Sequence, residues 1–467
     1  MVKKTTKKPK QDSERVKELK HHARRKSIQE GIFATGQYSF GNTYLSPFAI
    51  AINTSDAMIS LLGSIGGLFG PLSQMFSSRL IEKYPRKKIV LHSVFWEAIL
   101  WIPFILIAIL YSSGVVVNLL PLFLMLFFAI NMVIANIAGP AWFSWIGDIV
   151  DEEFRGRWFA KRNLIHGFIS IILSLAASFF LDFFKNQGWL MLGFMILFAL
   201  ALVCRLLSWQ FFKSQYEPKI KLKKADYFSF WQFLERAPKT NFGRFTIFRA
   251  VLAFAQTIGA PLFTVYLLRN LGFTYTIYIT ITVVGSFFSI VLIDLWGKFA
   301  DRYGNYKTMI VTAFFIPVVP ILWTLSSSPL YQIFIPSIIS GLAWAGFNLA
   351  SGNFIYDNVR PEKRGVAVSY YNMLVGLGTF LGAGLGAILI AYLNTSWIEP
   401  IILIFLICAV ARMFVIIFGI PYLKEVRKTR EFSGKSAFKN IIVKGTKSTL
   451  LEEAHQIMSI KEYIFEK

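Results

Sequence analysis

The stretch GKFADRYGNYK, at residues 297–307, places one acid and three bases between two long apolar segments. Charged residues at this spacing are suited to electrostatic contacts between helices rather than to the making or breaking of covalent bonds. A carboxylate such as Asp301 can lie against the positive N-terminus of a helix, and a guanidinium such as Arg302 can pair with an acid. Gly297, one turn before the acid, favours close approach of a second helix, as small residues do in membranes. We therefore interpret the stretch as a contact between helix ends.

A second copy of this cluster lies in SRLIEKYPRKK, at residues 78–88. There Glu82 and Lys83 stand where Asp301 and Arg302 stand in the first copy. A serine and a proline replace the two glycines, so we expect looser helix packing at this copy.

Another motif repeats at a fixed offset of 209 residues. GDIVDEEFRG contains Asp148 and Arg155, and YDNVRPEKRG contains Asp357 and Arg364 at the matching positions. Identities at the same offset continue beyond these stretches, from Asn163 to Asn372 and from Gly167 to Gly376, without a gap. The chain is therefore predicted to be two copies of one unit.

The composition is that of a membrane protein. Of the 467 residues, 55% are hydrophobic and 16% are charged, and the mean hydropathy is +0.53. In soluble domains, by contrast, about a quarter of all residues are charged. A spanning helix needs about 20 apolar residues, because its backbone must be satisfied internally. Twelve such spans are predicted, at 31–55, 58–78, 89–112, 118–147, 163–184, 188–212, 243–268, 274–297, 307–326, 330–356, 365–393 and 397–422.

Lysine and arginine are distributed unevenly between the two faces of these spans. The face that holds the N-terminus has 44 of the 49, and the opposite face has only Lys185 and Arg269. By the positive-inside rule we expect a multi-pass protein of the cell membrane with both termini in the cytoplasm. The basic arm at residues 1–30 suits contact with anionic lipid, and we expect no nucleic-acid partner.

Both motifs, each present twice among twelve spans, resemble those of the major facilitator superfamily of secondary transporters. The resemblance covers residues 31–422. It implies an all-α membrane fold with two six-helix halves, 31–212 and 243–422, joined by a cytoplasmic loop at 213–242. A cytoplasmic tail at 423–467 follows.

The resemblance also implies which helices the charges contact. Asp301 would face the start of the fifth span, near 157–163, and Glu82 the start of the eleventh, near 365–372. Such contacts join the halves, so they would close the cytoplasmic side and bias the balance of states. The alternative is a purely structural role, in which the charges only keep the short loops out of the bilayer. The candidate gating residues are Glu82, Lys83, Asp148, Arg155, Gly297, Asp301, Arg302, Asp357 and Arg364.

At membrane depth, where charges are costly and usually functional, we identify five candidate ionisable residues. They are Glu97, Arg205, Arg249, Asp294 and Arg412. We expect Arg205 and Arg412 to pair with the helix-end acids Asp148 and Asp357. Glu97 has no counterpart in the second half and is the candidate proton carrier, with a fixed ion pair to an arginine as the alternative.

Spans 1, 4, 7 and 10 line the central cavity that the resemblance implies. Amides and aromatic rings near their midpoints suit an uncharged or amphipathic organic solute, with Arg249 available for an anionic group. Any one of the amides can instead hold two helices together. The candidates are Tyr38, Asn42, Asn136, Arg249, Gln256, Trp344 and Asn348.

Signals for catalysis are missing from the sequence. No His/Cys cluster has metal-ligand spacing and no Ser/His/Asp set is placed for catalysis. We therefore expect the protein to bind no metal and no cofactor and to have no enzymatic activity. We expect a monomeric transporter that moves a small organic solute by alternating access among membrane lipids, with protons or another ion as the partner if transport is coupled. A lipid flippase or scramblase on the same fold, or a non-transporting membrane sensor, is the alternative.

Overall fold

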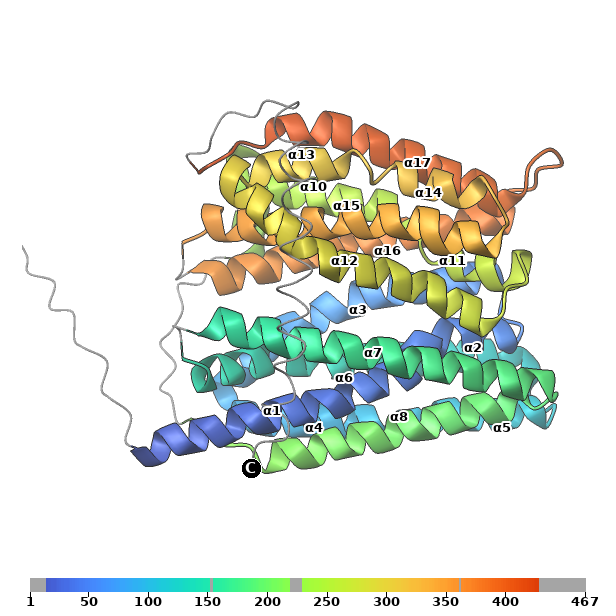
Figure 1. Ribbon diagram of the computed structural model, residues 1–467, viewed down its shortest axis with the longest axis horizontal. Coiled ribbons are helices and arrows are strands. Elements are labelled where there is room, and N and C mark those ends of the chain that lie inside the picture. Colours follow the sequence, from blue (N-terminus) through green and yellow to red (C-terminus); the bar gives the residue numbers. More distant parts are fainter. Residues whose placement is uncertain (1–13, 152–153, 219–228, 361–362, 428–467) are drawn as a thin grey trace, which may run out of the picture.

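The structure is a computed structural model that describes residues 14–151, 154–218, 229–360 and 363–427. Within these residues every regular element is a helix, which confirms the all-α class. The helices follow one long axis and are connected by loops at its two ends (Figure 1). Most of the predicted tail, beyond residue 427, and the arm before residue 14 lie outside the described residues.

The N-terminal half begins with a helix longer than the first predicted span. Helix α1 starts at Glu14, so residues 14–30 of the predicted arm continue into the bundle as one helix. The helices of this half are α1 (Glu14–Phe40), α2 (Leu45–Ala51), α3 (Asp56–Lys83), α4 (Arg86–Ile99), α5 (Trp101–Ser112), α6 (Leu120–Ile149), α7 (Arg155–Asn186) and α8 (Leu190–Lys213).

The C-terminal half follows a short helix, α9 (Phe230–Arg236), within the predicted central loop. Its helices are α10 (Asn241–Thr257), α11 (Leu262–Val265), the π-helical turn η4 (Tyr266–Asn270), α12 (Tyr275–Tyr303), α13 (Asn305–Ala313), α14 (Val318–Thr324), α15 (Pro329–Asn358), α16 (Arg364–Tyr392) and α17 (Pro400–Gly419).

Eleven helical segments of the described chain are long and apolar enough to cross a membrane. They correspond to the second to twelfth predicted spans. The first, at 31–55, is divided between α1 and α2 by a short turn at Asn42–Tyr44. A side chain at Gly41 would come within 2.2 Å of the Trp101 ring, so glycine lets the broken span pack there. The arrangement agrees with the twelve-helix fold.

Side-chain contacts repeat together with the sequence. Each repeated arginine donates hydrogen bonds to backbone carbonyls at the end of the helix before it, which satisfies groups that the helix leaves unpaired. The contacts are Arg155 with Gly147 and Val150, at 2.7 and 3.2 Å, and Arg364 with Tyr356 and Val359, both at 3.1 Å. All of these pairs are related by the 209-residue offset, which supports the two-copy interpretation.

The expected pairing of Arg205 with Asp148 is wrong. Arg205 binds the Glu97 carboxylate of α4 instead, with its two nitrogens at 2.5 and 3.0 Å from one oxygen. Asp148 forms an ion pair with Arg86, the first residue of α4. An acid at the end of one helix therefore pairs with the start of a neighbouring helix in the same half.

The expected pairing of Arg412 with Asp357 is also wrong. Asp357 accepts a hydrogen bond from Asn305, the first residue of α13, at 2.6 Å. Buried Arg412 donates to the backbone carbonyls of Gln256 and Ile316, each at 3.2 Å. These carbonyls lie at or just beyond the C-terminal ends of α10 and α13, where a helix dipole favours a cation. Arg412 thus holds together two spans that are broken in mid-course.

The two halves meet along α3 with α16 and along α7 with α12, the pairs that the resemblance implies. Glycine sets the first contact, because a side chain at Gly376 would lie 2.4 Å from the carbonyl oxygen of Gly67. Gly297 does not make the expected close approach, since its added carbon would meet Leu349 only at 3.9 Å. The close approach of α12 to α15 instead requires Gly341 of α15, where an added carbon would lie 2.6 Å from the carbonyl oxygen of Gly285.

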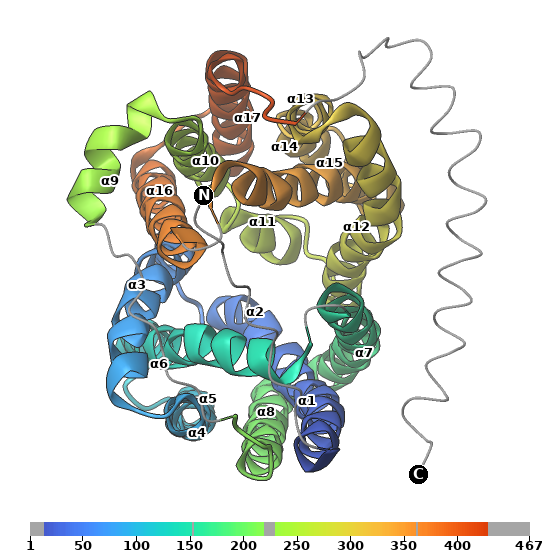
Figure 2. The same ribbon diagram turned by 90° about the vertical axis from the view of Figure 1, so that its left-hand side faces the viewer.

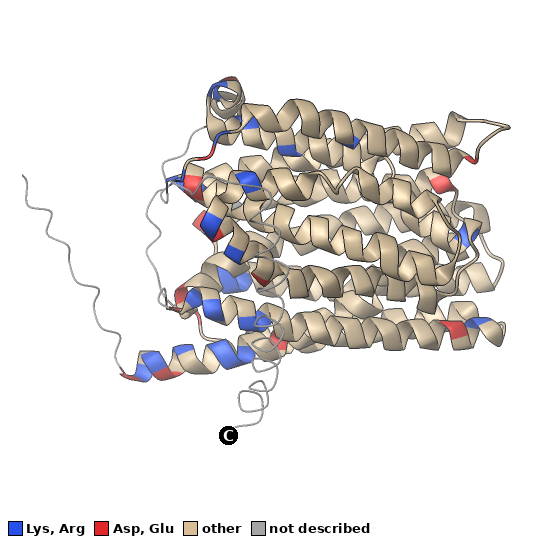
Figure 3. Cartoon of the chain, turned by 45° about the horizontal axis from the view of Figure 1, so that its top comes forward, with Lys and Arg blue, Asp and Glu red and all other residues tan. Residues whose placement is uncertain are grey.

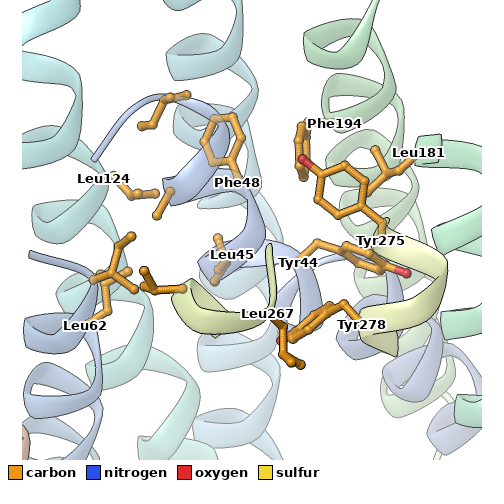
Figure 4. Close-up of a cluster of buried hydrophobic side chains, with 14 of the residues drawn as sticks. Tyr44, Leu45, Phe48, Leu62, Leu124, Leu181, Phe194, Leu267, Tyr275 and Tyr278 are labelled. Atoms are coloured by element: carbon orange, nitrogen blue, oxygen red, sulfur yellow. The ribbon is translucent and has the colours of Figure 1, made fainter. Parts of the chain in front are cut away.

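Among the described residues, the apolar core joins the two halves at one end of the bundle only. A single buried cluster there combines Tyr44 and Phe194 of the N-terminal half with Tyr275 of α12 (Figure 4). Toward the other end the buried clusters stay within one half, around Trp145 on one side and Phe354 on the other. Lysine and arginine gather at this second end (Figure 3), which we call the basic end; the sealed one is the far end. Figure 2 views the bundle from the basic end, with α2 and α11 deep between the halves.

Candidate solute site and gates

A pocket of about 390 Å³ lies in the C-terminal half between α12 and α15. Phe263 of α11 and Trp323 of α14 also line it, and their rings stack with centroids 4.0 Å apart. The lining combines hydroxyl groups with aromatic rings and contains no charged side chain. The hydroxyl-bearing residues are Tyr278, Thr282, Ser286, Ser289, Ser337 and Ser340.

Several of these hydroxyls are held as hydrogen-bond acceptors. Thr282 and Ser286 donate to backbone carbonyls one turn earlier in α12, at 3.2 and 3.0 Å, and Ser337 does the same in α15 at 3.0 Å. Because a hydroxyl has one donor and two acceptor sites, its lone pairs remain for another molecule. The pocket therefore suits a solute that presents O–H or N–H donors.

One of the predicted cavity residues lines this pocket, namely Trp344 of α15. Tyr38 of α1 is 56% exposed and is not part of the lining. All of the lining residues belong to the C-terminal half.

The four predicted amides do not line this pocket. Asn42 accepts a hydrogen bond at 2.6 Å from a glutamine of α1, and Asn136 accepts one at 3.2 Å from Gln74 of α3. Those two contacts fit the role of holding chain segments together. Gln256 is half-buried at the end of α10, and Asn348 is exposed on α15.

Arg249 is half-buried in α10 and held by aromatic side chains. Its Nε donates to the Tyr371 hydroxyl of α16 at 3.0 Å, and its guanidinium lies 4.9 Å from the ring centre of Phe347 in α15. Both contacts fix its position. They place a cation among three helices of the C-terminal half, outside the lining of the pocket.

Two ionic contacts join the halves at the far end. The Asp182 carboxylate of α7 accepts hydrogen bonds from the backbone N–H groups of Tyr275 and Thr276, at 2.9 and 2.8 Å. These are the first residues of α12, where a negative charge is stabilising. Arg269 of η4 forms an ion pair with Asp56, the first residue of α3. We call these two contacts the far-end latch.

At the basic end four of the nine predicted gating residues are exposed, and the other five are half-buried. Asp301, whose side chain is 80% exposed, lies 4.0 Å from Arg427 of the same half. Arg302 lies 5.5 Å from the ring centre of the neighbouring tyrosine. Glu82 and Lys83 are exposed at the end of α3. A gating role for these residues stays a prediction.

Glu97 belongs to a buried charge network of the N-terminal half. Arg205, which binds Glu97, also lies 3.4 Å from the Ser208 hydroxyl, and that hydroxyl donates to Glu30 at 2.9 Å. Arg162 lies 3.5 Å from the other Glu30 oxygen. Two acids and two bases therefore balance one another across α1, α4, α7 and α8.

Two features of these sites escaped the sequence analysis. Asp182 lies in the last turns of α7, where a negative charge is unfavourable toward its own helix dipole, and that mismatch is a readable signal. Thr282, Ser286 and Ser289 recur at intervals of four and three residues, which places their hydroxyls on one face of an apolar helix.

Comparison with known proteins identifies the family. The sequence model described as Major Facilitator Superfamily matches residues 31–256 and again 245–454. The Vacuolar basic amino acid transporter 1 of Saccharomyces cerevisiae is 27% identical over 161 residues, which are 34% of this chain and 28% of that protein. The Low-affinity glucose transporter HXT1 of the same yeast is 36% identical over 86 residues, 18% of this chain and 15% of that protein. The matches thus span less than a third of these relatives.

Solved structures share the fold. A bacterial homologue of the iron transporter ferroportin in an inward-facing state superposes with a TM-score of 0.66, at 14% identity, over 86% of this chain and 98% of that one. A bacterial homologue of ferroportin in an outward-facing state gives a TM-score of 0.54, at 14% identity, over 87% of this chain and 98% of that one.

Proposed function

Because the chain belongs to the major facilitator superfamily and is a membrane transporter of that type, we propose that it moves a small, uncharged, hydroxyl-bearing organic solute by alternating access. In this scheme the protein acts as a monomer in a cell membrane, with both termini in the cytoplasm. The uneven distribution of lysine and arginine between the two ends supports this orientation.

The observation that carries the proposed substrate class is the lining of the pocket between α12 and α15. It offers hydroxyl acceptors and aromatic rings and no charge, so an ionic solute would lose its hydration without gaining a counter-charge. A neutral solute with several hydroxyls can exchange its water contacts for these oxygens and lay an apolar face on Trp323 or Trp344. The local similarity to a glucose transporter supports the same class.

The proposed transport cycle rests on the asymmetry between the two ends. The halves share one apolar core at the far end and separate cores at the basic end, which supports a state that is open toward the cytoplasm. The higher TM-score with the inward-facing ferroportin homologue supports this assignment. In the opposite state we propose that the far-end latch breaks and that Asp301 and Glu82 close the basic end.

Coupling through Glu97 is not needed in this scheme. Its carboxylate is held by Arg205 in a balanced network, and removing the charge of one partner in such a buried pair costs about 3 to 5 kcal/mol. This supports the fixed ion pair over a proton carrier. Facilitated movement of the solute down its gradient is the simplest cycle that these contacts support.

Counterflow in proteoliposomes tests the proposal. Vesicles that contain the purified chain are loaded with an unlabelled neutral polyol, sugar or nucleoside, and uptake of its labelled form is measured beside labelled lysine and a fluorescent phospholipid. We expect counterflow of at least one neutral hydroxylated solute, and its loss in Trp344→Ala. Trp397→Ala, at a residue 76% exposed and outside the pocket lining, is the matched control. Movement of lysine or lipid alone would overturn the proposed substrate class.

A further inference from the structure

A groove of about 570 Å³ runs along the outer surface between α10 and α17. Its walls are apolar and open outward: Ile247 and Val251 of α10 are 38% and 43% exposed, and Phe418 and Tyr422 beyond them are 62% and 67% exposed. All four residues belong to segments long and apolar enough to cross a membrane. The groove therefore lies where acyl chains surround the protein.

A single arginine stands at one end of this groove. Arg244, in the first turn of α10, is part of the lining and is half-buried. Its Nε donates to the backbone carbonyl of Pro238 at 2.8 Å. This hydrogen bond holds the guanidinium beside the segment that precedes α10, at the basic end of the bundle. The terminal nitrogens of Arg244 have no acceptor that the structure describes among the residues around it. A cation is thus fixed at the point where the groove reaches the membrane surface.

Further bases surround this position. Arg236 and Lys239 are exposed just before α10, and the backbone of Lys424 is tied to Asn241, the first residue of α10, by hydrogen bonds of 2.9 and 3.0 Å. One exposed acid, Glu235, lies among them. Helix α9 projects from the rim of the bundle beside them (Figure 2). The mouth of the groove is therefore positively charged.

We infer that this groove binds an anionic phospholipid of the leaflet at the basic end, with its phosphate at Arg244 and an acyl chain between α10 and α17. A soluble anion would bind only at Arg244 and would leave the apolar walls of the groove uncovered. A soluble protein cannot reach a groove that faces the membrane. Bases at a membrane surface favour an anionic headgroup over a zwitterionic one by about fivefold for each contact.

Native mass spectrometry of the purified full chain tests this inference. The protein is exchanged into phosphatidylglycerol and phosphatidylcholine with identical acyl chains, and the lipid retained after activation is counted. We expect a preference for phosphatidylglycerol that falls about fivefold in Arg244→Gln. Lys88→Gln removes the same charge at the same end of the bundle, at the exposed start of α4 in the other half, and should leave the preference unchanged.

A second variant keeps the experiment decisive if Arg244→Gln does not fold. Val251→Trp fills the groove and retains every charge, and we expect it to release the bound phospholipid. Equal retention of the two lipids by the unaltered chain, or unchanged retention in Val251→Trp, would overturn the inference. A dimer that Val251→Trp converts to a monomer would overturn it as well, because the groove would then be a contact between two copies of the chain.

Discussion

Asp182→Asn removes one charge from the far-end latch and keeps its shape. The carboxylate accepts two backbone N–H groups of the first turn of α12, at 2.9 and 2.8 Å, and it is half-buried. A charge in this position at a helix N-terminus is worth about 1 to 2 kcal/mol, and an asparagine retains one acceptor but no charge. Because α7 and α12 belong to different halves, this energy is present only while the far end is sealed.

The loss should shift the balance of states toward the one that is open at the far end. A change of 1 to 2 kcal/mol alters a two-state ratio about 5- to 30-fold. Distances between spin labels at Val116 and Ser396, on exposed far-end loops of the two halves, report this shift in a background without native cysteines. We expect a population with longer distances in Asp182→Asn.

A control on α12, the helix that Asp182 contacts, separates the latch from general effects of charge. Asp294 of α12 pairs with Lys298 one turn later at 3.1 Å, within the same helix. Asp294→Asn removes an equal charge and should leave the far-end distances unchanged. If Asp182→Asn and Asp294→Asn give the same distances as the unaltered protein, the latch does not contribute to the balance of states and the reasoning fails.

Three further predictions concern two other acids and the orientation of the chain. Asp301→Asn should favour the state open at the basic end by up to about fivefold and lower turnover, because it weakens a helix-end contact by about 1 kcal/mol. Unchanged spin-label distances across the basic end would mean that Asp301 only anchors its loop. Glu97→Gln should lower the melting temperature, because it leaves Arg205 buried without its partner, and it should not alter the pH dependence of uptake; loss of that dependence in a folded variant would restore Glu97 as the proton carrier. A cysteine at Asn118 should react with an impermeant reagent in intact cells and one at Lys17 should not, and the reverse pattern would invert the proposed orientation.

Local sequence decided the spans, the repeat and the segregation of charge. About 20 apolar residues in a row predict a spanning helix whatever surrounds it, since the backbone must satisfy its own hydrogen bonds there. The 209-residue offset between Arg155 and Arg364 predicted matching roles, and the two side chains cap α6 and α15 in the same way. The start of the helix that forms the first span was the hardest boundary to predict, because the first turns of α1 are charged and exposed while its later turns enter the apolar bundle.

Only the tertiary structure decided which charges meet. Arg205 binds Glu97, 108 residues away in sequence, and Asp182 reaches the start of α12 across the boundary between the halves. Spacing along a helix fixes the face on which a side chain lies, but the neighbour on that face depends on how helices pack, which hydrophobic counts do not encode. Glycine illustrates the same limit: Gly297 and Gly376 are equal in sequence terms, yet only Gly376 lies against a neighbouring backbone, because that neighbour is set by the contact of α16 with α3.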